Sequence, residues 1–114
     1  MRARLASANE DKLRELRGLL PDWDLEALDM DGMPEETGAS FYDNARAKAR
    51  FGRMVSGLED WIIGEDSGLE VDGLAGAPGI RSARYAGPQA TDEENVAKLL
   101  AELAGAEGGA RQAR

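Results

Sequence analysis

A continuous apolar run constrains the fold of this chain more than any other feature of its sequence. Residues 61–64 read WIIG, with no polar side chain to face solvent. Runs of this kind are typical of strands that are buried on both faces, as in parallel sheets covered by helices. We therefore expect an α/β fold in which a mixed or mainly parallel sheet is flanked by helices, with residues 1–114 forming one domain.

Local signals place the other elements around this strand. Apolar spacing and capping residues indicate helices that begin after Asn9, Ser40 and Thr91 and end near Pro21, Val55 and Leu103. We expect further strands at residues 4–8 and 24–28, and a short one at 69–71. Residues 29–38 and 73–88 are rich in turn-forming residues, which favours loops without regular structure.

The composition excludes several classes of protein. The chain carries a formal charge of −8 and contains no histidine and no cysteine. A general nucleic-acid binder needs a basic surface for phosphates, so we expect no nucleic-acid partner. Disulfides and cysteine–zinc sites are excluded, and acid–base chemistry must use carboxylates, lysine or tyrosine. No apolar stretch is long enough for a signal peptide or a membrane span, so we expect a cytoplasmic protein without membrane contact.

Two adjacent carboxylates, Glu65 and Asp66, follow the apolar strand directly. Ligands of open α/β sheets bind at the carboxyl ends of strands. Neighbouring carboxylates repel each other unless a cation neutralises them, and Mg²⁺ prefers oxygen ligands of this kind. The pattern indicates a metal site, and the alternative is a solvated acidic turn.

A second polar cluster lies between the first expected strand and the first expected helix. Ser7, Asn9 and Lys12 place a hydroxyl, an amide and an ammonium group at the start of a helix. Backbone N–H groups at a helix start also favour anions, so the combination suits phosphate binding. The alternative is an ordinary helix cap with a surface lysine.

A third cluster combines an acidic loop with the helix that follows it. Glu35 and Glu36 lie in the loop, and Lys48 lies on the helix. A loop carboxylate would complete a metal site, and Lys48 would reach a phosphate. The alternative is a solvated loop before a helix, and the sequence leaves open which of the two glutamates would be the metal ligand.

A D-x-D-G pattern at Asp29 and Asp31 resembles the motif of haloacid-dehalogenase phosphatases. That motif requires a strongly apolar strand before it and usually a threonine after its glycine. Here residues 23–28 include the charged Asp24 and Glu26, and Met33 follows the glycine. Such a phosphatase therefore stays a remote alternative.

The order and spacing of the three clusters resemble the Ham1-like inosine triphosphate pyrophosphatases. That family opens with a strand and a T/S-x-N-x-x-K turn, matched here by residues 7–12. It continues with E-x-T-G-x-x-F-x-x-N-A-x-x-K-A, matched by residues 35–49. A long third block is matched by EDSGLEVDGLAGAPGIRSARYAG at residues 65–87. The resemblance covers nearly the whole chain and implies the family's α/β fold.

The resemblance also implies an activity, namely metal-dependent hydrolysis of ITP, dITP and XTP to the monophosphate and pyrophosphate. It implies that Asp66 is the general base and touches the metal, with Glu65 and Glu35 as the remaining metal-binding carboxylates. The implied cofactor is Mg²⁺, with Mn²⁺ as its substitute. The implied triphosphate contacts are Ser7, Asn9, Lys12, Lys48 and Ser67. The implied partners are a purine nucleoside triphosphate and a second copy of the chain, since the family is usually dimeric.

The chain departs from the family in one respect. Family members are considerably longer, and their second half carries G-F-G-Y-D-P-x-F and S-H-R segments that hold the purine base. Neither segment is present here. We therefore expect the N-terminal part of the family's fold, truncated before its C-terminal half. The alternative function is a catalytically inactive nucleotide-binding or dimerisation fragment that lacks the base pocket.

Overall fold

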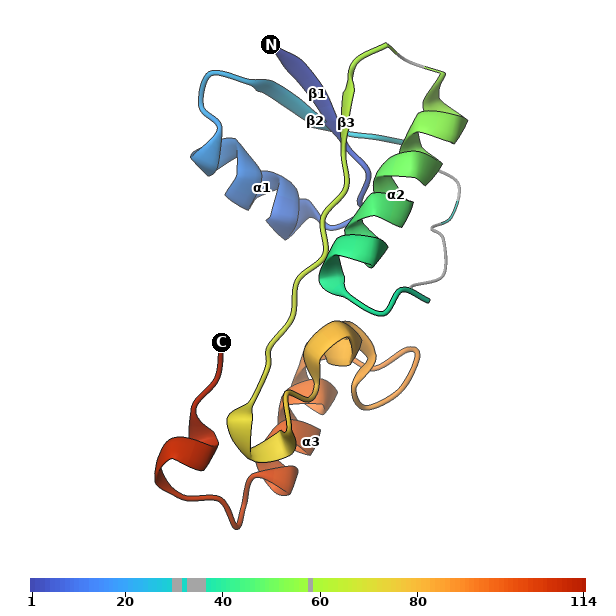
Figure 1. The fold of residues 1–114 in the computed structure, drawn as a ribbon. Helices are drawn as coiled ribbons and strands as arrows, with labels where there is room; N and C mark the ends of the chain where they lie inside the picture. Colours follow the sequence, from blue (N-terminus) through green and yellow to red (C-terminus); the bar gives the residue numbers. More distant parts are fainter. Residues whose placement is uncertain (30–31, 33–36, 58) are drawn as a thin grey trace. The chain divides into compact units, whose positions relative to one another are not determined.

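A computed structural model of the chain describes residues 1–29, 32, 37–57 and 59–114. Its main elements are β1 (Arg2–Leu5), α1 (Glu10–Leu19), β2 (Asp24–Ala27), α2 (Phe41–Ser56), β3 (Trp61–Ile63) and α3 (Asp92–Glu102), drawn in Figure 1. The chain divides into two compact units, Met1–Asp66 and Ser67–Arg114. That these units form one domain stays a prediction.

The first unit is built on a parallel sheet with the strand order β2-β1-β3, which confirms the expected α/β class. In the register, Ala3 of β1 lies between Leu25 of β2 and Trp61 of β3. Central β1 carries the core, since Ala3 and Leu5 are fully buried. The strand that we expected at residues 4–8 begins at Arg2 and ends at Leu5, since its register pairs Arg2–Leu5 with β2 and Ala3–Leu5 with β3.

The expectation that residues 61–64 are buried on both faces is wrong for the structure described. Among the described strands, β3 pairs with β1 alone and forms an edge of the sheet. Trp61 is 62% exposed, and Ile62 and Ile63 are only partly buried. The apolar run is a strand as expected, but its position at the edge leaves part of its surface in contact with solvent.

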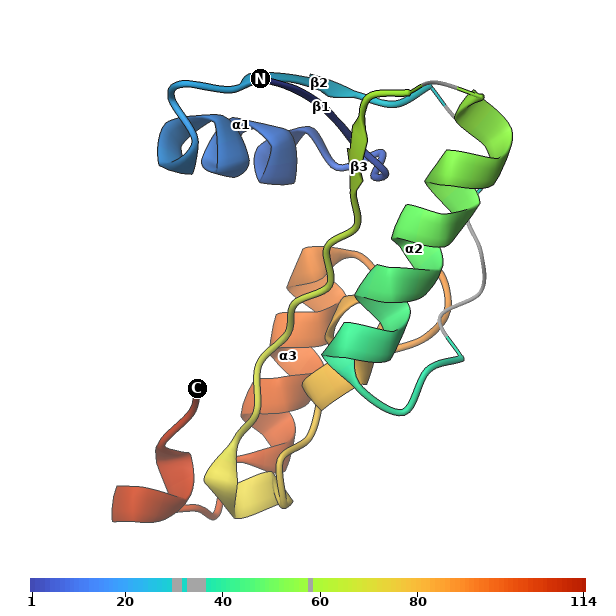
Figure 2. The same cartoon turned by 45° about the horizontal axis from the view of Figure 1, so that its top comes forward.

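The two helices of the first unit begin and end where their capping residues predict. The Asn9 side chain accepts the N–H groups of Asp11 and Lys12 at the start of α1. Ser40 caps α2 in the same way, and α2 ends at Gly57, whose φ of 59° favours glycine. In Figures 1 and 2, α1 lies beside β2 and α2 lies beside β3.

Glycines bring α2 close to the sheet. A Cβ atom on Gly64, just after β3, would lie 1.9 Å from the carbonyl oxygen of Ala45 and 2.7 Å from the nitrogen of Ala49. A Cβ atom on Gly52 would lie 3.0 Å from the side chains of Ala6 and Ile62. This close approach places the first turns of α2 beside the end of β3.

The second unit replaces an expected loop with short 3₁₀-helices. The expected loop at residues 73–88 contains η2 (Gly79–Arg84) and most of η1 (Asp72–Leu74). A third 3₁₀-helix, η3 (Gly108–Arg111), follows α3. The expectation of no regular structure was wrong, because glycine and proline punctuate these 3₁₀ turns without preventing their i→i+3 bonds. The strand expected at 69–71 is reduced to isolated bridges, Glu70 with Pro78 and Val71 with Ala113.

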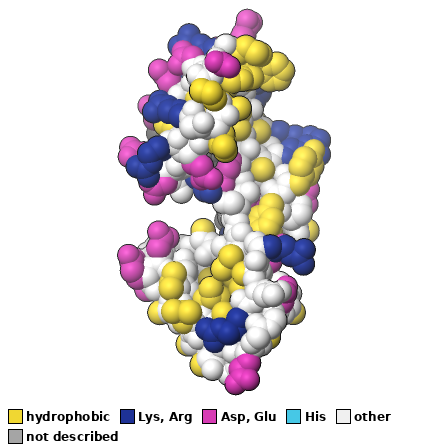
Figure 3. Space-filling model, turned by 90° about the vertical axis from the view of Figure 1, so that its left-hand side faces the viewer, with side chains coloured by type: hydrophobic (Ala, Val, Ile, Leu, Met, Phe, Trp, Pro, Cys, Tyr) yellow, Lys and Arg dark blue, Asp and Glu magenta, His cyan; other side chains and the backbone are white. Residues whose placement is uncertain are grey.

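The last helix, α3, begins with a reciprocal cap. Thr91 accepts the N–H of Glu94, and the Glu94 side chain accepts the N–H of Thr91. The core of this unit contains Val71 and Leu103. Of its large hydrophobic side chains, Leu69, Val96 and Leu100 are exposed. Figure 3 shows hydrophobic side chains among charged ones on the face that it draws. None of the helices in the described part of the chain is both long and apolar enough to cross a bilayer.

Candidate active site

The turn between β1 and α1 is an ordered cap with a pocket beside it. The Ser7 hydroxyl accepts the N–H of Asn9 over 3.1 Å, and Asn9 Oδ1 accepts the N–H groups of Asp11 and Lys12 over 3.0 and 3.2 Å. The pocket has a volume of about 330 Å³ and is lined by Ser7, Ala8, Asn9, Glu10, Ala27, Leu28 and Asp29. The helix cap and the expected phosphate site are therefore the same residues.

Lys12 links this turn to the carboxyl end of β3. Its Nζ lies 3.8 Å from Oε1 of Glu65 and 3.5 Å from Oε2 of Glu15. The side chains of Lys12 and Glu65 are 28% and 21% exposed, so both are partly accessible to solvent. Lys12, which is expected to bind phosphate, and Glu65, which is expected to bind the metal, thus lie next to each other.

Asp66 is the more buried of the two carboxylates, with only 8% of its side chain exposed. The amide nitrogen of Asn44 donates to its Oδ2 over 3.1 Å. The ammonium of Lys48 lies 3.8 Å from its Oδ1 and donates to the carbonyl oxygen of Glu65 over 3.2 Å. Both oxygens of Asp66 therefore face groups on α2 that are one helical turn apart.

The structure brings together most of the residues that the sequence singled out. Lys12, Lys48, Glu65 and Asp66 form one connected set in the first unit, next to the turn that holds Ser7 and Asn9. Ser67 is the first residue of the second unit. Glu35 and Glu36 lie outside the described residues, so their part in the site stays a prediction.

Asn44 is the residue of this set to which sequence reasoning gave no role. It is 1% exposed, and its side chain contacts both Asp66 and the backbone of Gly38. Its spacing of four residues from Lys48 on a predicted helix was the available signal, because that spacing puts both side chains on one face.

The chemistry of the donor set fits a hard divalent cation. Glu65 and Asp66 offer carboxylate oxygens, and the chain has no histidine or cysteine to attract zinc. Within the residues that the structure describes, no three acidic side chains gather closely enough to hold a metal ion. The third carboxylate expected from the sequence, Glu35, lies outside them.

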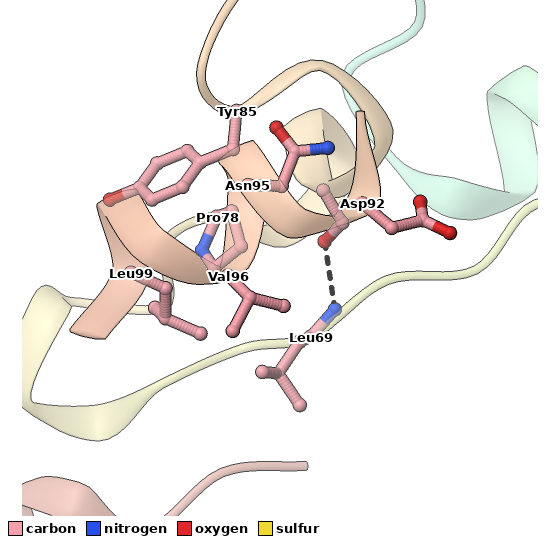
Figure 4. A pocket seen from close by; sticks show the side chains of 8 residues that line it. Leu69, Pro78, Tyr85, Asp92, Asn95, Val96 and Leu99 are labelled. Carbon is pink, nitrogen blue, oxygen red and sulfur yellow. Dashed lines mark hydrogen bonds between the residues drawn. The ribbon is translucent and has the colours of Figure 1, made fainter. Parts of the chain in front are cut away.

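A separate pocket of about 230 Å³ lies within the second unit and was not expected from the sequence. Its lining is Leu69, Pro78, Ser82, Tyr85, Asp92, Asn95, Val96 and Leu99. In Figure 4, Val96 and Leu99 point from α3 toward the segment of Leu69, whose N–H donates to the Ser82 hydroxyl over 2.8 Å. The residues that line this pocket include no lysine or arginine.

This chain is similar to known proteins in sequence. A model of the Ham1 family matches residues 3–114. A dITP/XTP pyrophosphatase of Methylococcus capsulatus is 51% identical over 114 residues, which cover 96% of this chain and 56% of that protein. A dITP/XTP pyrophosphatase of Yersinia pseudotuberculosis is 50% identical over 103 residues, 87% of this chain and 51% of that protein.

Solved structures agree with this similarity. A HAM1 protein from Coxiella burnetii matches with a TM-score of 0.79 and 38% identity, over 99% of this chain and 58% of that one. A nucleoside-triphosphatase, or dITP/XTP pyrophosphatase, from Mycobacterium abscessus matches with a TM-score of 0.70 and 40% identity, over 99% of this chain and 60% of that one. The chain thus spans between half and two thirds of the length of these proteins.

Proposed function

Because this chain belongs to the Ham1 family, we propose that it is the metal- and phosphate-binding part of a nucleoside triphosphate pyrophosphatase. The substrates are non-canonical purine nucleoside triphosphates (ITP, dITP and XTP), and the products are the monophosphate and pyrophosphate. The observation that carries the proposal is the position of Asp66. Its carboxylate is nearly buried at the end of β3, held by Asn44 and faced by Lys48.

Asp66 is the proton acceptor in this proposal. A water molecule attacks the α-phosphorus, a new P–O bond forms, and the bond from that phosphorus to the bridging oxygen of the β-phosphate breaks. The proton of the water passes to a carboxylate oxygen of Asp66, and pyrophosphate leaves with the bonding electron pair. A carboxylate can serve as the general base in a chain without histidine.

Glu65 and Asp66, with Glu35 as a further expected ligand, would hold Mg²⁺ or Mn²⁺. A bound divalent cation offsets the negative charge of the phosphates and of the leaving pyrophosphate. The side chains of Glu65 and Asp66 lie within 4 Å of lysine ammonium groups, so both carboxylates already have a positive charge beside them.

The triphosphate is bound by the cations and the helix start that surround these carboxylates. Lys12 and Lys48 supply positive charge, and the turn of Ser7 and Asn9 lies at the positive end of the α1 dipole, which favours an anion. Ser67 is proposed as a further triphosphate contact because the family motif implies it. We further propose a homodimer and a cytoplasmic location, which a mass measurement in solution and cell fractionation would test.

The decisive experiment is product analysis with dITP and dGTP as paired substrates. We expect slow pyrophosphate release from dITP in the presence of Mg²⁺ and none in EDTA, with little discrimination against dGTP, because the segments that hold the base in the family are not among these residues. Binding of a non-hydrolysable dITP analogue without pyrophosphate release would favour the inactive fragment instead. Release of orthophosphate from monophosphates would favour the phosphatase alternative, which the similar proteins do not support.

A further inference from the structure

We propose that Asn44 is a positioning residue that fixes the orientation of the Asp66 carboxylate, and this inference rests on the function proposed above. Its amide joins Asp66 to the backbone of Gly38. The role differs from those of the lysines, because Asn44 carries no charge and is too deeply buried, at 1% exposed, to meet a nucleotide directly.

The two partners of Asn44 fix which way its amide points. Asp66 offers only acceptor oxygens when ionised, so the Nδ2 group of Asn44 must face it, as it does over 3.1 Å. Gly38 offers an N–H donor over 2.8 Å, so Oδ1 must face that side. A flipped amide would lose both hydrogen bonds, which leaves one arrangement of this side chain.

The backbone around Asn44 is shaped to make this link. Asn44 lies in the first turn of α2, where its own N–H donates to the carbonyl oxygen of Ser40 over 3.2 Å. A Cβ atom on Gly38 would lie 2.5 Å from Asn44 Oδ1, closer than real Cβ contacts. Glycine at position 38 is therefore needed for the approach of the backbone to this amide.

The carboxylate of Asp66 needs an external restraint to hold one orientation. Rotation about the last side-chain bond of an aspartate is broad, because no staggered minimum fixes a planar group. Asn44 holds Oδ2, and Lys48 faces Oδ1 at 3.8 Å from the next turn of the same helix. Asn44 is thus the directional partner, while the lysine supplies charge at a longer distance.

The test compares Asn44→Ala with a matched asparagine in the second unit. Asn95 also ties two backbone positions, with Oδ1 accepting from Ala86 over 2.8 Å and Nδ2 donating to Ala83 over 3.1 Å. We expect N44A to lower kcat for dITP by about 10- to 100-fold with KM changed less than about threefold, since misplaced catalytic groups cost rate in this range. We expect N95A to leave kcat within about twofold of the parent.

A double-mutant cycle separates positioning from general damage. If Asn44 acts through Asp66, N44A should cause almost no further loss of kcat in an Asp66→Asn background. Additive losses, or equal losses in N44A and N95A, would overturn the inference. Should N44A fail to fold, N44D retains an acceptor for Gly38 and lacks the donor, and its kcat should fall similarly.

A readout without turnover distinguishes failure of this inference from failure of the proposed function. Amide exchange measured by NMR on the purified chain should show a protected Gly38 N–H and slowly exchanging Asn44 side-chain protons. Asp66→Ala should speed exchange of the Asn44 protons, whereas Asp72→Ala should not. A parent chain that shows this pattern but releases no pyrophosphate would refute only the proposed function. Unprotected Asn44 protons would refute the positioning role whatever the activity.

Discussion

The side-chain nitrogen of Lys12 lies 3.8 Å from Oε1 of Glu65, joining the first turn of α1 to the carboxyl end of β3. The sequence separates these residues by the whole of β2 and α2. The parallel sheet brings them together because β1 and β3 are neighbours and their carboxyl ends meet at one edge. A phosphate ligand and a metal ligand are thereby expected at adjacent positions.

Lys12→Ala should weaken binding of a triphosphate far more than binding of a monophosphate. A hydrogen bond to a charged group contributes about 1.5–3 kcal/mol, so we expect Kd for a non-hydrolysable dITP analogue to rise about 10- to 100-fold. Arg14→Ala removes the same charge from the same helix at a residue paired with Asp11, and should have little effect. Titration calorimetry measures both ligands, and equal weakening of the two would show that Lys12 has a structural role.

Asp66→Asn should abolish most turnover while preserving the shape of the site. Loss of a general base typically lowers the rate by about 10²- to 10⁴-fold. Glu65→Gln is the matched comparison, because it removes a carboxylate that is proposed only as a metal ligand. We expect a high Mg²⁺ concentration to restore much of the rate of E65Q but not that of D66N. Initial rates of pyrophosphate release against Mg²⁺ concentration would reveal the difference, and restoration of D66N would contradict the role of base.

Gly64→Ala should destabilise the first unit. The new Cβ would lie 1.9 Å from the backbone oxygen of Ala45, and neither chain segment can yield without moving α2. Overpacking of this kind costs about 1–3 kcal/mol of unfolding free energy. Gly18→Ala is the control, since nothing lies within 4 Å of its Cβ position on α1, and it should stabilise by about 0.5–1 kcal/mol. Urea denaturation should show opposite signs for the two variants.

Ionisation of Tyr85 should depend on Glu102. The phenol donates a hydrogen bond to the Glu102 carboxylate, and this bond, followed by partial desolvation and charge repulsion, raises the pKa of Tyr85 above its ordinary value. The chain has two tyrosines, and Tyr42→Phe leaves Tyr85 as the only one. In that background, Glu102→Ala should lower the pH at which tyrosinate absorbance appears.

The same contact gives stability a defined dependence on pH. Because the folded-state pKa of Tyr85 is raised, its contribution is fully present below the unfolded value of about 10 and is lost as pH rises through the folded value. The stability difference between the Y42F and Y42F/E102A proteins should therefore shrink over that alkaline range. An unchanged titration midpoint in Y42F/E102A would show that the hydrogen bond does not form in solution.

Features that depend on local chemistry were predictable from the sequence. The caps at Asn9, Ser40 and Thr91 formed as expected, because each side chain needs only the backbone two or three residues onward. The place of Glu65 and Asp66 just after a strand was also predictable, since they follow an apolar run directly.

Features that depend on tertiary position were not predictable in the same way. The apolar run at residues 61–64 indicated a strand, but periodicity does not say whether a strand is central or at an edge, and β3 is at an edge. The spacing of Asn44 from Lys48 placed both residues on one helix face, but the role of Asn44 was not predictable, because its partners Gly38 and Asp66 lie on other segments and meet it only in the folded chain.

Glu65 and Asp66 each have a lysine ammonium group within 4 Å before any ligand arrives, Lys12 for Glu65 and Lys48 for Asp66. Under the proposed function, nucleotide and divalent cation would therefore enter by counter-ion exchange, in which phosphates bind the lysines as the cation binds the carboxylates. A phosphate that binds a lysine frees the carboxylate beside it for the cation, and a cation that binds a carboxylate frees the lysine for a phosphate. The two ligands should therefore bind cooperatively. Removal of the cation by a chelator should leave the first unit folded, since Glu65 and Asp66 then pair with Lys12 and Lys48 and these lysines screen the repulsion between the two carboxylates.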